Sequence, residues 1–203
     1  MKNASSRQHR LDTRIVAGLD KLSLASRILL WDTAKQKSLS PIQIQFLLYL
    51  ANHPRERRRV TQLAREFGLT KPTVSAAVKS LTAKRLVSRR PCKEDGRVHT
   101  LDLTTLGKSV AKRMSNWQGA IGNRIQNFPQ GTKETVMLFL MELIRSLHAA
   151  GIIKVARMCT LCENFRKDAH PGSEKRHHCA LTDTPLAVSD MNIDCTTHQA
   201  QTA

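Results

Sequence analysis

The chain has 203 residues, a net charge of +17 and five cysteines, and only 4% of its residues are aromatic. This length allows one domain, or one domain with a small appendage. Neither a signal-peptide core nor a long apolar run is present, so the sequence predicts a cytoplasmic chain with no membrane partner. The scarcity of aromatic residues argues against single-stranded nucleic acids and RNA as partners, because their binding proteins stack bases on aromatic side chains.

The positive charge is confined to one part of the chain. Residues 1–157 hold 29 Lys and Arg against 10 Asp and Glu, whereas residues 158–203 hold 4 against 6. A basic surplus of this size is expected of a domain that neutralises phosphates. We therefore divide the chain into a basic domain, residues 1–157, and a cysteine-rich module, residues 158–203.

The first predicted element is a long helix from about residue 11 to residue 37, where apolar residues recur at helical spacing. Residues 1–8 are polar and are expected to fray. The apolar face of this helix is larger than a small core needs, which suggests a partner subunit. Ser40-Pro41 then begins a second helix that ends at Asn52.

The stretch from residue 60 to residue 81 has the pattern of two helices joined by a tight turn. Gly68 is typical of a residue that ends a helix, Thr70 is a suitable N-cap, and Pro72 fits the first turn of the next helix. The second helix has a buried stripe of Val74, Ala77, Val78 and Leu81. Short polar and basic residues remain on its exposed side, which predicts a helix-turn-helix.

Two stretches that alternate like β-strands follow, at residues 86–90 and 97–103. Asp95-Gly96 between them is a strong hairpin signal. The resulting two-stranded wing carries four basic residues, Arg89, Arg90, Lys93 and Arg97. The predicted fold is mainly α, a winged helix-turn-helix suited to duplex DNA.

Several short motifs in this part resemble the MarR family of bacterial transcription regulators. They are Leu63-Ala64, Lys71-Pro72-Thr73-Val74-Ser75, Leu81, Leu86-Val87, Asp95-x-Arg97 and Leu103-Thr104-x-x-Gly107. The resemblance covers residues 10–150 in helix order, departs at Lys84-Arg85, where the family commonly has a glycine, and does not include the tail after residue 155. It implies a dimeric, cytoplasmic repressor or activator and does not identify a ligand.

An arginine-rich run at residues 53–59 lies immediately before the helix-turn-helix. Two interpretations stay open: a solvated loop, or a clamp on DNA phosphates that sets register and affinity. The candidate DNA-binding residues come from this run, the exposed side of the second motif helix, and the wing. They are Arg57, Arg58, Arg59, Lys71, Thr73, Ser75, Ala76, Lys79, Arg89, Lys93 and Arg97.

Two further helices are predicted over residues 105–128 and 131–153, separated by Pro129-Gln130-Gly131. The second of them has apolar residues on more than one face: Val136, Leu138, Phe139, Leu140, Leu143, Ile144 and Leu147. This exceeds the needs of one small core. We therefore expect dimerisation through the N- and C-terminal helices, with this last helix against its counterpart in a twofold homodimer.

The tail holds four cysteines, Cys159, Cys162, Cys179 and Cys195, with His178 and His198 as alternative or supporting ligands. Four thiols match the ligand number of a closed tetrahedral zinc site, and the C-x-x-C pair can chelate one ion from a turn. An iron–sulfur cluster, which also takes four cysteines, is the alternative cofactor. Few apolar residues are available in the tail, so a folded tail is expected to need a metal staple.

Unligated thiols in a disordered tail are a third interpretation of the four tail cysteines.

Cys92 differs from the four tail cysteines, because it stands alone between Pro91 and Lys93. Nearby positive charge could make it reactive, but a lone cysteine is more often inert, which is the interpretation we favour.

The sequence favours a sequence-specific regulator that binds a double-stranded DNA operator as a homodimer, most simply a repressor. The C-terminal cysteines make a response to metal or redox state a natural hypothesis, and a small-molecule effector stays open. One alternative is a nucleoid-type DNA-binding protein with a structural zinc tail. An enzyme that uses thiols or metal is disfavoured, because the chain has neither a nucleotide loop nor an H-E-x-x-H motif.

Overall fold

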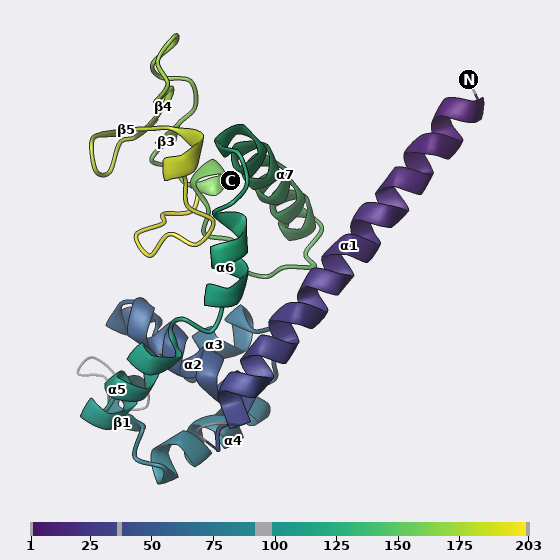
Figure 1. Cartoon of the computed structure of the whole chain (residues 1–203). Coiled ribbons are helices and arrows are strands. Elements are labelled where there is room, and N and C mark those ends of the chain that lie inside the picture. Colours follow the sequence, from purple (N-terminus) through teal and green to yellow (C-terminus); the bar gives the residue numbers. More distant parts are fainter. Residues whose placement is uncertain (1, 36–37, 92–98, 202–203) are drawn as a thin grey trace.

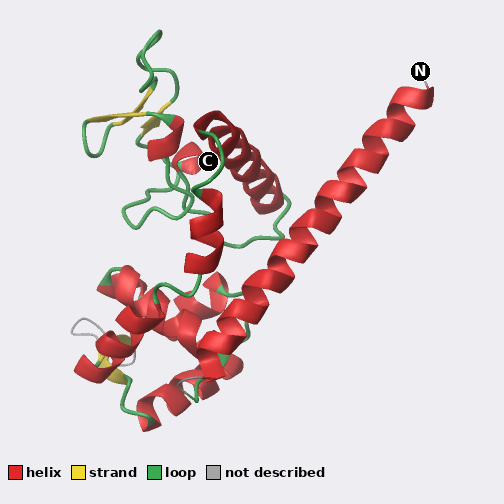
Figure 2. Cartoon of the chain, in the orientation of Figure 1, coloured by secondary structure: helices red, strands yellow, loops and turns green. Residues whose placement is uncertain are grey.

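The computed structural model describes residues 2–35, 38–91 and 99–201. It has a long helix α1 (Lys2–Lys35), a winged domain beside the end of α1, and a second lobe made of helix α7 (Gln130–Ala149) and the cysteine-rich tail (Figure 1). Helices dominate the described part of the chain, and strands occur in the wing and in the tail (Figure 2). The prediction of a mainly helical winged helix-turn-helix is confirmed.

Helix α1 is longer than the sequence pattern predicts. It begins at Lys2, whereas the apolar pattern predicts a helix only from about residue 11. No proline or glycine precedes Gly18, and the alanine, arginine and glutamine residues of the first turns have fair to good helix propensity. The helix projects well beyond the winged domain (Figure 1) and exposes large apolar side chains, among them Val16 and Leu22.

The helices of the winged domain begin where the sequence places their caps. Helix α2 (Pro41–Asn52) has a capping box, in which Ser40 and Gln43 bond to each other's backbone N–H groups. A 3₁₀ turn (Arg55–Arg57) leads to the short α3 (Val60–Glu66), and Gly68 then adopts a φ of +61°. Thr70 caps α4 (Lys71–Ala83) through the Thr73 N–H, as predicted.

The wing consists of β1 (Val87–Pro91) and β2 (His99–Leu103), which pair antiparallel with Val87 opposite Leu103 and Pro91 opposite His99. The predicted Asp95-Gly96 turn lies outside the described residues. Just before the wing, Arg85 has a φ of +57°. The MarR resemblance places a glycine near this point, and the left-handed backbone explains why glycine suits it.

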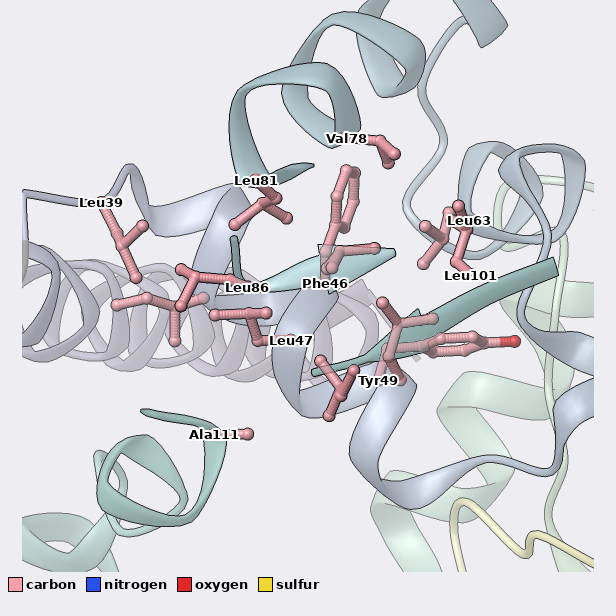
Figure 3. Packing of buried hydrophobic residues seen from close by; sticks show 14 of the residues in the cluster. Leu39, Phe46, Leu47, Tyr49, Leu63, Val78, Leu81, Leu86, Leu101 and Ala111 are labelled. Atoms are coloured by element: carbon pink, nitrogen blue, oxygen red, sulfur yellow. The ribbon is translucent and has the colours of Figure 1, made fainter. Parts of the chain in front are cut away.

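The core of the winged domain lies where α2, α4 and the wing meet. Phe46, Leu47 and Leu50 of α2 are fully buried, and in Figure 3 Phe46 lies among Val78, Leu81 and Leu101. Of the stripe predicted on α4, Val74, Val78 and Leu81 are buried, as is Leu63 of α3, whereas Ala77 is only partly buried. Each such side chain contributes about 1.5–3 kcal/mol by burial. Helix α4, the second helix of the helix-turn-helix, therefore packs on a rigid core.

The single helix predicted over residues 105–128 is wrong. The chain forms α5 (Thr105–Met114) and α6 (Gly119–Ile125), separated by a turn in which the Gly119 N–H donates to Asn116 O at 2.9 Å. The Ser115 hydroxyl bonds to Lys112 O at 2.8 Å and so competes with the helical pattern. Two glycines in α6 lower its helix propensity, so the local sequence does not favour a continuous helix over the turn.

The tail has a small sheet of its own, which the sequence does not predict. Strands β3 (Phe165–Arg166), β4 (His177–Cys179) and β5 (Thr184–Leu186) are antiparallel in the order β3-β4-β5, with 3₁₀ turns at Cys159–Leu161 and Val188–Asp190. A second core of Met141, Met158 and Met191 joins this tail to α7. Part of the apolar face of α7 is therefore covered by the tail of the same chain. No helix among the described residues is both long and apolar enough to cross a membrane.

Gly107 in the first turn of α5 lies against the backbone of Leu86, and its substitution tests how closely α5 packs there. A Cβ at this position would meet the carbonyl oxygen of Leu86 at 2.0 Å. We expect Gly107→Ala to lower the free energy of unfolding by about 1–3 kcal/mol or more, because backbone must move to relieve the overlap. Urea denaturation followed by circular dichroism measures the change.

Gly122→Ala is the matched control. Nothing lies within 4 Å of the Cβ it would introduce in α6. Alanine there is expected to leave stability unchanged or raise it by up to about 1 kcal/mol. Equal effects of the two substitutions would contradict the close approach of α5 to the Leu86 backbone.

Candidate nucleic-acid interface and cysteine module

The recognition helix α4 presents one polar and basic face to solvent. Lys71, Thr73, Ala76 and Lys79 are exposed, while Ser75 is half-buried. On the opposite side Val74, Val78 and Leu81 enter the core. Ala76 is small enough to let a helix approach base edges, and lysine and threonine can bond to bases or phosphate. The predicted exposed set is therefore brought together on one surface.

Two polar side chains of α4, one in its first turn and one near its end, are engaged within the protein. The Thr73 and Thr70 hydroxyls lie 2.8 Å apart, and the Ser80 hydroxyl accepts a hydrogen bond from the Gln43 amide at 2.9 Å. The bond from Gln43 ties α4 to α2 across the domain. These bonds fix the rotation of α4 about its axis, which decides which residues face a DNA groove.

Asp102 on β2 pairs with arginines of the wing and of the loop before α3. Its carboxylate lies 3.6 Å from Arg55 Nη2, 3.8 Å from Arg58 Nη1 and 3.5 Å from Arg90 Nε. Arg89 and Arg90 are exposed on β1, whereas the predicted Lys93 and Arg97 lie outside the described residues, as does Cys92. Sequence reasoning missed Asp102. The sequence signal that could have identified it is a single carboxylate in a predicted strand next to strongly basic segments.

The predicted phosphate clamp at residues 57–59 is partly engaged within the protein. Arg57 Nη2 donates to the His198 carbonyl oxygen at 3.1 Å, and Arg58 Nε donates to the His53 carbonyl oxygen at 2.7 Å. All three arginines are half-buried, and the Arg59 Nε is a buried donor that has no partner among the described residues. These contacts fix the loop against the domain. Their role toward DNA stays a prediction.

The four tail cysteines lie on segments that hydrogen bonds hold together. Cys159 N–H donates to Asn192 O at 3.0 Å, and Asn192 N–H donates to the Cys159 Sγ at 3.2 Å. Cys195 N–H donates to Arg157 O at 2.7 Å, Phe165 N–H donates to Cys162 O at 3.1 Å, and Cys179 is paired with Phe165 in the sheet. The fold therefore gathers residues that are up to 36 positions apart in the sequence.

The thiols have different surroundings. Burial raises the pKa of Cys159, and the nearby Cys195, Cys179 and Cys162 raise it further. The Thr182 hydroxyl and the N–H groups of Thr182 and Leu181 bond to the Cys179 sulfur and lower its pKa. Donors aimed at a sulfur favour the thiolate, which is the form that binds metal.

The side chains themselves do not form a finished metal site. Among residues 2–35, 38–91 and 99–201, no three His, Cys, Asp or Glu side chains are grouped so that they could hold a metal ion. Backbone contacts nevertheless bring the four cysteine-bearing segments together. The donor set suits a thiophilic metal.

The two candidate histidines have partners of their own. His198 is buried, and its Nε2 lies 3.1 Å from the Leu161 carbonyl oxygen. His178 Nε2 lies 3.2 Å from an Asp183 oxygen, and its Nδ1 lies 3.2 Å from His170 Nε2. These contacts leave the cysteines as the better metal donors.

A cleft between α2 and α5 has basic residues on its wall, including Arg58, Lys108 and Lys112.

The winged part of the chain is similar to known regulators. The model of the MarR family matches residues 37–98. The structure of the S. aureus MepR–DNA complex is 21% identical with a TM-score of 0.58, and the match covers 65% of this chain and 97% of MepR. A MarR protein from Peptoclostridium difficile is 20% identical with a TM-score of 0.59, covering 67% of this chain and 88% of that protein.

BldR from Sulfolobus solfataricus is likewise 21% identical, with a TM-score of 0.53 and coverage of 66% of this chain and 95% of BldR. At these identities the likeness shows a shared fold. No curated protein matches the chain. The cysteines of the tail lie beyond the residues that the family model matches.

The surroundings of Cys179 predict its reactivity in reduced, metal-free protein. Alkylation of Cys179 by iodoacetamide should have a pH midpoint below that of an ordinary thiol, because the bonds to its sulfur lower its pKa. Thr182→Val removes the hydroxyl, so the midpoint should rise and alkylation at pH 7.5 should slow. Mass spectrometry of the labelled peptide across pH measures the midpoint. Thr196→Val is the control, and a shift as large in the control would contradict the assignment.

Proposed function

We propose that the chain is a MarR-type winged helix-turn-helix transcription regulator without enzymatic activity, and that it represses a double-stranded operator as a homodimer. The MarR family model matches residues 37–98, and the winged domain has the fold of the MepR–DNA complex. One observation carries the proposal: the exposed face of α4 holds Lys71, Thr73, Ala76 and Lys79 beside a basic wing. Such a helix fits the major groove, and the wing meets the backbone or the minor groove.

Specific recognition is favoured over nucleoid-type binding. A protein that only neutralises phosphates needs positive charge, and residues 1–157 have a surplus of it. The helix α4 additionally has short side chains at the positions where base edges would be met, and its rotation is fixed by the Gln43–Ser80 bond. A fixed rotation serves base readout and is unnecessary for charge neutralisation.

Homodimer formation has support from exposed apolar surface. Large apolar side chains remain exposed on three helices: Leu11, Ile15, Val16, Leu22, Leu24, Ile28 and Trp31 on α1, Ile125 on α6, and Val136, Leu138 and Phe139 on α7. A second copy of the chain would cover these faces and place two recognition helices on the two halves of a palindromic operator.

The operator prediction separates the roles of helix and wing. Lys79→Ala on α4 should weaken binding to a selected operator more than binding to random duplex, because base contacts contribute about 1–3 kcal/mol of discrimination. Arg89→Ala on β1 should weaken both equally and reduce the slope of log affinity against log salt by about one. Fluorescence anisotropy at several salt concentrations measures both effects.

Lys154→Ala is the matched control for this experiment, because Lys154 is exposed and lies beyond the end of α7. It should change neither affinity nor discrimination. If wild-type protein binds the selected and the random duplex equally well, the nucleoid-type alternative replaces the operator-specific one.

The cysteine module is proposed as the input of the regulator, through metal or redox state. The convergence of four cysteine-bearing segments, the N–H groups aimed at Cys159 and Cys179, and the small size of the tail core support this role. A bound ion would supply the cross-links that three buried methionines alone do not. Zinc is the proposed cofactor and an iron–sulfur cluster the alternative.

Metal content tests this assignment directly. Anaerobically purified protein should be colourless with about one zinc per chain, whereas a brown protein would identify a cluster. Replacing Cys159 and Cys162 together by serine should remove the metal, because a serine hydroxyl is not deprotonated at neutral pH. The winged domain should stay folded, because its core is separate from the core of the tail.

Cys92→Ser controls for the loss of a thiol as such and should keep the metal. Elemental analysis and absorption spectra distinguish these outcomes. Wild-type protein that contains no metal when purified anaerobically, and takes up neither zinc nor iron, would exclude the metal input.

A further inference from the structure

Arg157 joins the cysteine module to the helix-turn-helix. It precedes Cys159 by two residues, is only 8% exposed, and bonds to carboxylates on both sides. Its Nη1 and Nη2 atoms donate to Glu66 Oε2 and Oε1 at 2.7 and 2.9 Å, and its Nε donates to Asp194 Oδ1 at 2.7 Å. Glu66 is the last residue of α3, and Asp194 is the neighbour of Cys195.

The backbone around Arg157 is part of the same connection. Its carbonyl oxygen accepts the Cys195 N–H at 2.7 Å, and Arg157 and Asp194 form a parallel bridge. The positions of the segments that carry Cys159 and Cys195 therefore determine where the guanidinium lies. A change in the distance between those two cysteines must move either the Asp194 or the Glu66 contact.

A second contact runs beside the first. The Arg57 guanidinium donates to the His198 carbonyl oxygen at 3.1 Å, and His198 N–H donates to Cys195 O at 3.3 Å. His53 Nε2 lies 3.9 Å from Asp194 Oδ2, and the His53 ring is stacked on Tyr49 of α2. The tail thus contacts the segment between α2 and α3 through residues on both sides of Cys195.

The contact with Glu66 matters for the shape of the recognition unit. A carboxylate at the C-terminal end of a helix is unfavourable, because the helix dipole places negative charge there. Arg157 neutralises Glu66 at that end of α3, which has only seven residues. Helices this short depend on tertiary contacts. Through Gly68 and Thr70, the end of α3 leads directly into α4.

We propose that Arg157 transmits the state of the cysteine site to the recognition helix, so that metal bound by the four cysteines strengthens operator binding. This inference rests on the proposed metal input. With metal bound, the segments of Cys159 and Cys195 are held together, Arg157 stays on Glu66, and α3 and α4 keep the arrangement that fits DNA. Without metal, the segment of Asp194 and Cys195 moves away from Cys159, Arg157 moves with the segment that it bonds to, and Glu66 loses its partner.

The coupling is reciprocal, because two ligands that bind one protein alter each other's affinity by the same factor. Coupling of this kind typically changes affinity by about 5–150-fold, and we expect about tenfold here. Operator DNA should therefore raise the affinity for zinc by the same factor.

The experiment compares operator binding of full-length, reduced protein loaded with zinc and stripped by a chelator. The operator is a duplex selected from a random pool by the zinc-loaded wild type. Stripping should weaken binding of the wild type about tenfold and binding of Arg157→Gln less than about twofold. Arg157→Gln should still bind zinc, because it retains all four cysteines.

Asp194→Asn is the second variant, since the Asp194 side chain is 56% exposed and Arg157 keeps its bidentate bond to Glu66. It should lose the response to zinc even if Arg157→Gln fails to fold. Arg145→Gln is the matched control, because Arg145 makes an exposed ion pair with Glu142 on α7. That variant should respond to zinc like the wild type.

Two results would contradict the inference in different ways. If the wild type responds to zinc and both Arg157→Gln and Asp194→Asn respond equally, the metal input stands and transmission through Arg157 is excluded. If the wild type binds zinc but binds the operator equally with and without it, the metal input itself fails.

Discussion

The position of the cysteine module depends on the guanidinium of Arg157, which lies between Glu66 and Asp194. Burial opposes its charge, but hydrogen bonds to the two carboxylates outweigh this and raise its pKa above the ordinary value. A buried ion pair adds little net stability, because desolvation offsets the attraction, whereas loss of one partner leaves an unpaired charge and costs about 3–5 kcal/mol. The contact therefore selects one docking geometry of the tail rather than contributing most of its stability.

Local patterns were sufficient to predict the winged domain. Ser40, Gly68, Thr70 and Pro72 act through their own backbone conformation or through bonds three residues away, so their roles can be derived from the sequence. The break between α5 and α6 was missed, because helical periodicity continues across it while the Ser115 and Asn116 bonds end the helix. The small sheet of the tail was missed because its strands have only two or three residues.

The candidate site was predictable in its residue types but not in its connections. The exposed side of α4 follows from helical spacing, and the four cysteines follow from their spacing and number. Asp102 and Arg157 could not be found in this way, because their partners come from distant parts of the chain: Arg157 and Glu66 are separated by 91 positions. The local sequence does not distinguish Arg157 from the other Lys and Arg residues, 33 in all, as the residue that pairs the tail with α3.

Helix α7 has apolar residues on two sides, which contact different neighbours. One side holds Met141 in the core of the tail, while Val136, Leu138 and Phe139 remain exposed for the proposed partner subunit. In a twofold dimer the tail and the partner would thus share one rigid helix. If the tail binds metal as proposed, its state reaches the recognition helix of its own subunit through Arg157 and Glu66. The exposed side of α7 would hold the two subunits together, so each half of the operator would be read by a recognition helix that is supported by its own tail.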